Sequence, residues 1–452
     1  MSIIAIKDAA AIVTMDPEIG VVKNGTILIQ KGRVVAVGHN INIPDNARIL
    51  LAKDSVIYPG FVNTHHHFFQ SLFRGVPRVQ SAKLFDWLTY LYPLWARIDP
   101  DILFAASRLA IAELLLSGCT TTSDHHYLFP DTAPKDLIDA EFEAADEMGI
   151  RFMGTRGSMS RGQSDGGLPP DNVVQTEAEI MSDSERVIEK WHDPSPFAMI
   201  RVALAPCSPF SVTTALMQET QALARKRHVR LHTHLAETMD EETYCMETYG
   251  MRPLKYMEST KWLGEDVWYA HGVYFTDEEL QLLARTGTGV AHCPVSNLRL
   301  GSGVAKIPQM LGLGVSVGLG VDGSASNDSS NILREIQTEL LIHRVNSGVD
   351  SMDVQKTLQT ATIGGARVLG WDRVGQLSPG WAADLSMWKV NTIPMAGFWD
   401  PVAAPIMGTP FNAADLVIVN GKVIVKDGRL MGIEHQRIVK DAQIAIKKLM
   451  EI

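Results

Sequence analysis

From about residue 56 onward, short apolar runs alternate with longer stretches whose apolar positions recur at helical spacing. Near-continuous apolar runs separated by helices are typical of strands in a parallel sheet. The strand candidates are Val56–Val62, Cys119–Asp124, Ile150–Arg156, Ile200–Ala205, Val229–His234, Val267–His271, Thr288–His292 and Val315–Asp322. Eight strand candidates, most of them followed by a helical stretch and spread over roughly 250–300 residues, predict a closed (β/α)8 barrel of the TIM type.

Both ends of the chain have a different pattern. Gly25–Gln30 and Arg33–Val37 are short β-rich runs joined by a hairpin signal, and Asn420-Gly421 is a strong hairpin turn near the other end. We therefore expect an α/β protein in which the two ends pair into one small β-domain. The predicted division is residues 1–58 for the first part of a β-sandwich, 59–372 for the barrel, and 373–452 for the second part with a closing helix.

Composition and charge narrow the possible functions. The chain has 452 residues, of which 46% are hydrophobic and 20% are charged, and its net charge is -10. It has no basic stripe, which argues against nucleic-acid binding, and no apolar run long enough to span a membrane. The four cysteines are scattered without a CxxC pair and read as reduced thiols. We expect a cytoplasmic homo-oligomer without nucleic-acid or membrane partners.

Histidines gather where strand candidates end. His65 and His67 directly follow the first one, and residues i and i+2 of an extended chain point to the same side. His234, His271 and Asp322 end three further strand candidates. The carboxyl ends of barrel strands meet at one mouth, where active sites lie. Imidazoles with a carboxylate there predict a metal site that suits zinc, with ferrous iron as the alternative.

Glu237 follows His234 by three residues and should lie at the same mouth. A carboxyl group beside a metal site and against an apolar wall can have a raised pKa and transfer protons. The alternative is a glutamate placed at the start of a helix, where the dipole favours it. Its position next to a predicted ligand favours proton transfer.

Other histidines compete for roles near this mouth. His125 and His126 end the second strand candidate and could form the pocket wall. His232 shares the face of His234 but lies one step deeper, which favours barrel packing. His292 ends the seventh strand candidate, where holding the rim together explains it at least as well as catalysis.

The fourth strand candidate, Ile200–Ala205, contains no lysine. A two-metal site needs a bridging ligand, which a modified lysine of this strand often supplies in barrel hydrolases, so its absence favours one metal ion. The zinc-deaminase signature of His-x-Glu with Pro-Cys-x-x-Cys is absent too, because Pro206-Cys207 lacks the second cysteine.

These motifs together resemble the amidohydrolase superfamily over nearly the whole chain. The segments that carry the resemblance are Pro59–His67, His234–Glu237, Ala270-His271, His292–Asn297 and Val321–Asn327. The resemblance implies a (β/α)8 barrel beside a β-sandwich built from both chain ends. It also implies an aminohydrolase acting on C–N bonds in cyclic amidines.

The resemblance further implies one Zn²⁺ per subunit, held by His65, His67, His234 and Asp322 together with a water molecule. Zinc lowers the pKa of bound water to about 7. In the implied reaction Asp322 takes a proton from that water and a ring carbon bearing an amino group is attacked. Glu237 protonates the neighbouring ring nitrogen, His271 stabilises the tetrahedral centre, and ammonia leaves.

Within the family, the chain is most similar to 8-oxoguanine deaminases, through segments such as Leu84–Thr89 and Asp165–Asp171. Branches acting on guanine, isoxanthopterin or hydroxylated s-triazines share several of these segments. Gln70, Trp95 and Cys207 are candidates for binding the heterocycle. Guanine deaminases of this type carry an arginine near the position of Cys207, so the cysteine argues against plain guanine. A binding protein without catalysis on the same scaffold is the remote alternative.

Overall fold

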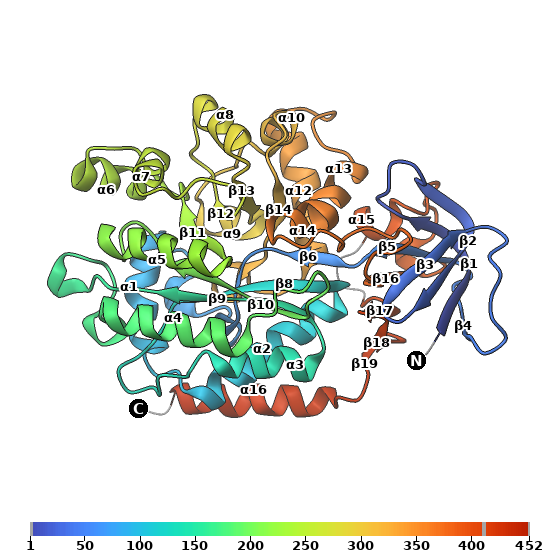
Figure 1. Cartoon of the computed structure of the whole chain (residues 1–452), viewed down its shortest axis with the longest axis horizontal. Helices are drawn as coiled ribbons and strands as arrows, with labels where there is room; N and C mark the ends of the chain where they lie inside the picture. Colours follow the sequence, from blue (N-terminus) through green and yellow to red (C-terminus); the bar gives the residue numbers. More distant parts are fainter. Residues whose placement is uncertain (1–2, 409–412, 451–452) are drawn as a thin grey trace.

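The computed structural model describes residues 3–408 and 413–450. Parallel strands close into a barrel in the order β10-β11-β12-β13-β14-β6-β8-β9 (Figure 1). Their bounds are β6 (Phe61–Asn63), β8 (Cys119–His126), β9 (Arg151–Ser158), β10 (Ile200–Pro206), β11 (Arg230–Leu235), β12 (Val267–His271), β13 (Gly289–His292) and β14 (Val317–Leu319). The predicted (β/α)8 fold is confirmed.

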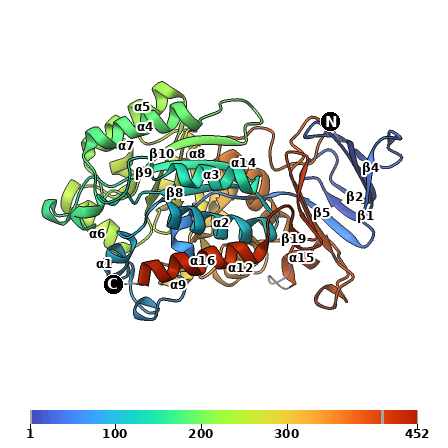
Figure 2. The ribbon, with the colours of Figure 1, turned by 90° about the horizontal axis from the view of Figure 1, so that it is seen from below.

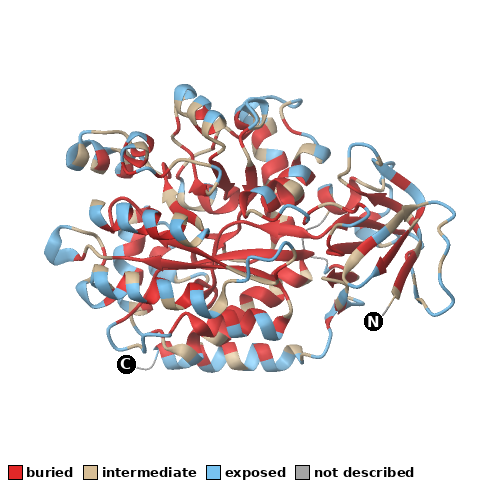
Figure 3. Ribbon diagram, in the orientation of Figure 1, coloured by how far each residue is buried: buried red, intermediate tan, exposed pale blue. Residues whose placement is uncertain are grey.

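Helices follow the strands and cover the outside of the barrel, with their buried faces turned inward (Figure 3). The main ones are α2 (Pro100–Leu116), α3 (Asp139–Met148), α4 (Glu177–Trp191), α5 (Thr214–Arg227), α8 (Asp277–Thr286) and α12 (Ile332–Ser347). Local sequence sets their ends: Thr176 and Glu179 form a capping box at the start of α4, and His228 ends α5 in the left-handed conformation.

Further helices complete the connections. They are α1 (Leu84–Trp95), α6 (Met239–Tyr249), α7 (Pro253–Ser259), α9 (Pro294–Leu300), α10 (Ile307–Gly312), α11 (Ser324–Asn327), α13 (Val354–Gln359), α14 (Gly365–Val368) and α15 (Ala404–Met407). The predicted closing helix is α16 (His435–Met450), which lies against α2 (Figure 2). An ion pair of 2.9 Å between Arg108 and Asp441 joins these two helices. Among the described residues, no helix has both the length and the apolar composition needed to cross a membrane.

The two chain ends share one mixed sheet of nine strands beside the barrel. Its members are β1 (Ile3–Val13), β2 (Val21–Gln30), β3 (Arg33–Gly38), β4 (Arg48–Leu51), β5 (Ser55–Pro59), β16 (Leu385–Lys389), β17 (Leu416–Val419), β18 (Lys422–Lys426) and β19 (Arg429–Leu430). β5 joins the ends, because it pairs with β1 on one side and β16 on the other. Both predicted hairpins form, β2 with β3 and β17 with β18.

The first strand candidate, Val56–Val62, is two strands in the structure. β5 belongs to the terminal sheet and β6 to the barrel, and the chain passes between them at Gly60. A Cβ atom on Gly60 would lie 2.0 Å from Oγ1 of Thr120, so only glycine fits this crossing. The last candidate is divided as well, into β14 and the short β15 (Asp322–Gly323), which pairs with β7 (His66–His67) above the barrel.

Candidate active site

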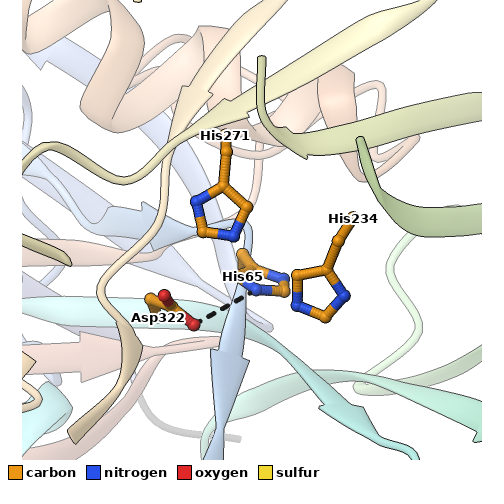
Figure 4. A group of neighbouring side chains, drawn as sticks. All are labelled: His65, His234, His271 and Asp322. Carbon is orange, nitrogen blue, oxygen red and sulfur yellow. Dashed lines mark ion pairs between the residues drawn. The ribbon is translucent and has the colours of Figure 1, made fainter. Parts of the chain in front are cut away.

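All five predicted ligand or catalytic side chains at the strand ends meet at the barrel mouth. The ligand atoms of His65, His234, His271 and Asp322 lie within 4.8 Å of one another (Figure 4). Nε2 of His67 lies 3.1 Å from Nε2 of His234 and 3.2 Å from Oδ1 of Asp322. The ribbon of β7 and β15 brings His67 and Asp322 together, because their strands pair directly.

Backbone carbonyls fix the protonation of two of the imidazoles. Nδ1 of His67 lies 2.8 Å from the carbonyl oxygen of His125, and Nδ1 of His234 lies 2.6 Å from that of Cys207. A carbonyl only accepts hydrogen bonds, so each Nδ1 carries a proton, and Nε2 is the nitrogen left to face the centre of the mouth. Burial lowers the pKa of His234 to about 3, which keeps its ring neutral.

His65 is oriented through a second imidazole. Its Nδ1 lies 2.8 Å from Nε2 of His232, whose Nδ1 lies 3.0 Å from the carbonyl oxygen of Trp268. His232 therefore donates to Trp268 and accepts from His65, which leaves Nε2 of His65 with a free lone pair. That Nε2 is buried and forms no hydrogen bond with the described residues, although Oδ1 of Asp322 lies 3.4 Å away. Barrel packing, predicted for His232, is thus only part of its role.

Asp322 completes this group as a carboxylate. Its Oδ1 faces His65 at 3.4 Å, and its Oδ2 accepts a hydrogen bond of 2.6 Å from the hydroxyl of Ser296. Burial acts to raise the pKa of Asp322, but the contacts with His65 and His67 hold it well below its ordinary value. Three imidazoles and one carboxylate whose nitrogen and oxygen atoms converge are a donor set that zinc accepts.

Glu237 is buried beside this group, as predicted. Its Oε2 lies 3.6 Å from Nε2 of His271, and burial raises the pKa of its carboxyl. The backbone that carries it is clamped by Glu241, whose carboxylate accepts hydrogen bonds of 3.0 Å from the N–H groups of Ala236 and Glu237. Sequence reasoning missed Glu241, although the spacing of four residues from Glu237 was a signal.

His271 differs from the other imidazoles of the mouth. Burial acts to lower its pKa, but the nearby charges of Glu237 and Asp322 outweigh burial and raise it. Its Nδ1 lies 2.9 Å from Oδ1 of Asn297, and its backbone has a positive φ of 74°. For a residue other than glycine such a backbone is strained, and strained residues cluster at functional sites.

The remaining candidate histidines lie beneath or beside the mouth. The ring of His125 stacks on that of His234 with centroids 4.8 Å apart, so His125 lies beneath the predicted ligand His234. His126 points away from the mouth and contacts Glu141 at 3.0 Å. His292 contacts a histidine of α12, His343, at 3.1 Å, consistent with a role in holding the rim together.

A cavity opens above the converging side chains of His67, His234, His271 and Asp322. Gln70 and Cys207 both line it, together with the aromatic rings of Trp87, Tyr92, Tyr127 and Phe210. Oε1 of Gln70 is buried without a partner among the described residues, and burial raises the pKa of Cys207 to about 12, so its thiol is neutral. Trp95 does not reach the cavity: it is fully buried behind Trp87 and Tyr92, at ring distances of 5.3 and 5.5 Å.

Comparisons with known proteins agree with this geometry. The sequence profile of the amidohydrolase family matches residues 56–424. An 8-oxoguanine deaminase of Pseudomonas aeruginosa is 43% identical, over 94% of this chain and 95% of the relative. An isoxanthopterin deaminase of an unknown prokaryotic organism is 36% identical, over 89% and 87%.

Solved structures extend the comparison to the whole fold. The zinc complex of an atrazine chlorohydrolase from Arthrobacter aurescens TC1 superimposes with a TM-score of 0.95 at 32% identity. The match covers 98% of this chain and 100% of that structure's chain. The barrel, the converging donor atoms and these relatives together show that the chain belongs to the amidohydrolase family and is a hydrolase acting on C–N bonds.

Proposed function

We propose that the protein deaminates an amino-substituted purine-like heterocycle, with 8-oxoguanine as substrate and urate and ammonia as products. The observation that carries the reaction is that the converging imidazole and carboxylate atoms lie at one cavity with the buried Glu237, whose pKa is raised. The 43% identity to an 8-oxoguanine deaminase supports the substrate.

In this proposal His65, His67, His234 and Asp322 hold one Zn²⁺, with Fe²⁺ as the alternative ion. The reason is their geometry: a hydrogen bond holds Nδ1 of each imidazole, so that Nε2 faces the position of the ion, and the pKa of Asp322 is well below its ordinary value. A bound zinc ion supplies Lewis acidity, which polarises a water molecule and lowers its pKa. No lysine of β10 is present to bridge a second ion, which supports a single metal.

Three side chains move or hold protons in the proposed reaction. Asp322 accepts a proton from the attacking water, because its low pKa keeps it ionised. Glu237 has a raised pKa and gives its proton to the ring nitrogen next to the attacked carbon. His271 donates from Nε2 to the developing oxyanion. The proton held by Asp322 then passes to the amino group, which leaves as ammonia. Glu237, now ionised, takes the hydroxyl proton as the ring carbonyl forms, which restores its protonated state.

The cavity suits a flat ring. Aromatic walls can stack on a heterocycle, while the free Oε1 of Gln70 can accept a hydrogen bond from an N–H on its edge. Cys207 presents a neutral thiol where guanine deaminases of this type carry an arginine, which favours another purine. Trp95 supports the wall from behind and takes part in binding only through Trp87 and Tyr92.

Ammonia release from four compounds tests the proposal: 8-oxoguanine, guanine, isoxanthopterin and a hydroxylated aminotriazine. The zinc-loaded protein should show its highest kcat/KM with 8-oxoguanine. A higher value with isoxanthopterin or the triazine would reject the substrate but keep the reaction class. Release from none of them would reject both and favour the binding-protein alternative. Glu237→Gln protein, assayed in parallel, shows whether any ammonia comes from this site.

A further inference from the structure

A second cavity lies at the opposite end of the barrel, where the strands begin. Its volume is about 370 Å³. It is bordered by the first residues of β10 and β11 and by the segments that follow α4, α5 and α14. Arg201, Arg225 and Arg230 line it, and its lining includes a single carboxylate, Asp266.

That carboxylate already has a partner. Oδ2 of Asp266 lies 2.9 Å from Nε of Arg225, which also contacts Gln221. His192 adds no positive charge near neutral pH, because burial lowers its pKa below the ordinary value. Asp266 also acts on Arg230 through its charge, but the lining still holds three arginines against one carboxylate.

Arg230 is the least satisfied of the three arginines. Its Nε is buried without a hydrogen-bond partner among the described residues, and no hydrogen bond to a carboxylate affects its pKa. The guanidinium rests against Gly370, where an added Cβ would lie 2.9 Å from its Nη1, and faces Trp268 at 5.8 Å. Burial lowers its pKa to about 10, so it stays protonated near neutral pH.

Arg201 is held in place but not neutralised. Its Nη1 and Nη2 donate to the carbonyl oxygens of Gly370 and Ser195 at 2.6 and 2.8 Å, while its Nε is buried without a partner among the described residues. Asp372 acts on both Arg201 and Arg230 through its charge, but it forms no ion pair within 4.0 Å with either in the described part of the chain. Half-buried arginines that outnumber the carboxylates around one cavity favour the binding of an anion there.

We propose that this cavity binds a phosphate group, free or as part of a small phosphate monoester. The planar guanidinium presents paired N–H donors that match phosphate oxygens, and a phosphate monoester carries close to two negative charges at pH 7. The excess of two arginines over carboxylates in the lining matches that charge. The site is separate from the barrel mouth, and the inference does not depend on the reaction or the substrate proposed there.

Isothermal titration calorimetry of the full-length, zinc-loaded protein tests this site. Inorganic phosphate and ribose 5-phosphate are titrated separately at constant ionic strength. We expect one equivalent to bind with a Kd below 1 mM and at least tenfold more weakly to Arg230→Gln protein. Arg230→Lys, which keeps the charge, should recover part of the affinity. Arg437→Gln, which removes an exposed arginine of α16, should bind as the wild type does.

Each outcome decides the proposal. Tighter binding of the ester than of phosphate identifies a metabolite site, and equal binding identifies a site for the free ion. Unchanged affinity in Arg230→Gln would place the anion elsewhere, the zinc site included, and overturn the proposal. Absence of binding of both probes to the wild type at 10 mM would overturn it too. Arg201 would then have only the structural role of donating hydrogen bonds to the carbonyls of Gly370 and Ser195. The wild-type titration needs no variant, so misfolding of Arg230→Gln cannot hide this result.

Discussion

Nδ1 of His65 lies 2.8 Å from Nε2 of His232, and this contact fixes which nitrogen of His65 can bind a metal. Nε2 of His232 accepts a hydrogen bond from His65, because the proton of the His232 ring lies on Nδ1, which donates to the carbonyl of Trp268. Its ring also stacks on the indole of Trp268, with centroids 4.3 Å apart. A chain of two hydrogen bonds thus runs from the barrel interior to the predicted ligand, as in metal sites whose outer partners orient the ligands.

Replacing His232 by leucine should weaken zinc binding roughly 10- to 100-fold, because Nδ1 of His65 loses its acceptor. Competition with a chelator of known affinity measures the change. His232→Gln should retain part of the affinity, because its amide oxygen can accept the same hydrogen bond. His39→Gln serves as the control, since His39 is an exposed histidine in a loop. Equal zinc affinity in His232→Leu and wild type would show that His65 needs no such partner.

Glu237→Gln should lower kcat roughly a hundredfold or more while leaving zinc content and thermal unfolding unchanged. The amide keeps the shape of the side chain but cannot give a proton to the ring nitrogen. Steady-state kinetics with metal analysis of the same sample checks this. A variant that turns over at more than a tenth of the wild-type rate would remove Glu237 from the reaction.

Asp322→Asn should lose both activity and part of its metal. The amide has one oxygen instead of two, and it can no longer hold the proton of the attacking water. We expect turnover to fall by roughly a hundredfold or more even when zinc is added in excess, since restoring the ion does not restore the proton acceptor. Recovery of most activity with excess zinc would limit Asp322 to metal binding.

Glu241→Gln should lower kcat roughly tenfold with little change in KM. Its carboxylate uses both oxygens to hold the N–H groups of Ala236 and Glu237, whereas an amide offers only one acceptor. The backbone there is strained, with a φ of 56° at Ala236, so the loss should let Glu237 move. Loss of positioning affects the chemical step more than binding. A rise in KM at unchanged kcat would contradict this role.

The sequence predicted the barrel and the meeting of these side chains at its mouth, because both follow from where the apolar runs end. A parallel barrel places every strand end at one mouth, so His234, His271 and Asp322 meet without knowledge of any distance. The split at Gly60 was missed, because Val56–Val62 is apolar throughout and the change of sheet depends on contact with Thr120.

Contacts between side chains from different strands could not be predicted from the sequence either. The bond between His65 and His232 depends on how deep each ring sits in the barrel, which periodicity does not specify. Trp95 was expected at the substrate, but α1 turns that ring into a cluster of aromatic side chains behind the cavity. The arginines at the barrel floor are dispersed along the chain and share no motif, so only the fold brings them together.

The buried carboxyl pair of Asp124 and Glu141 should make the free energy of unfolding depend on pH. Both side chains are fully buried, and Glu141 also contacts the neutral ring of His126 at 3.0 Å. Burial raises the pKa of Glu141 to about 8, although the neighbouring Asp124 acts in the opposite direction. Burial and the charge of Glu141 raise the pKa of Asp124 as well. Two buried carboxyls whose oxygens lie within 4.8 Å of each other repel when both are ionised, so one of them keeps a proton.

The native protein therefore keeps a proton on this pair near neutral pH. The unfolded chain has lost that proton, because the pKa of Glu141 there is near its ordinary value of 4.5. The contribution of this pair to the free energy of unfolding is fully present below about pH 4.5 and is lost as the pH rises toward 8. The free energy of unfolding falls over this range by at most about 1.4 kcal/mol per pH unit. Glu141→Gln carries no titrating proton at this position, so its unfolding free energy minus that of the wild type should increase between pH 5.5 and 7.5. Urea unfolding at fixed zinc concentration measures this difference, and because both proteins keep the same metal-binding histidines, their own pH dependence cancels. A difference that stays constant over that range would show that the pair is ionised in the native state.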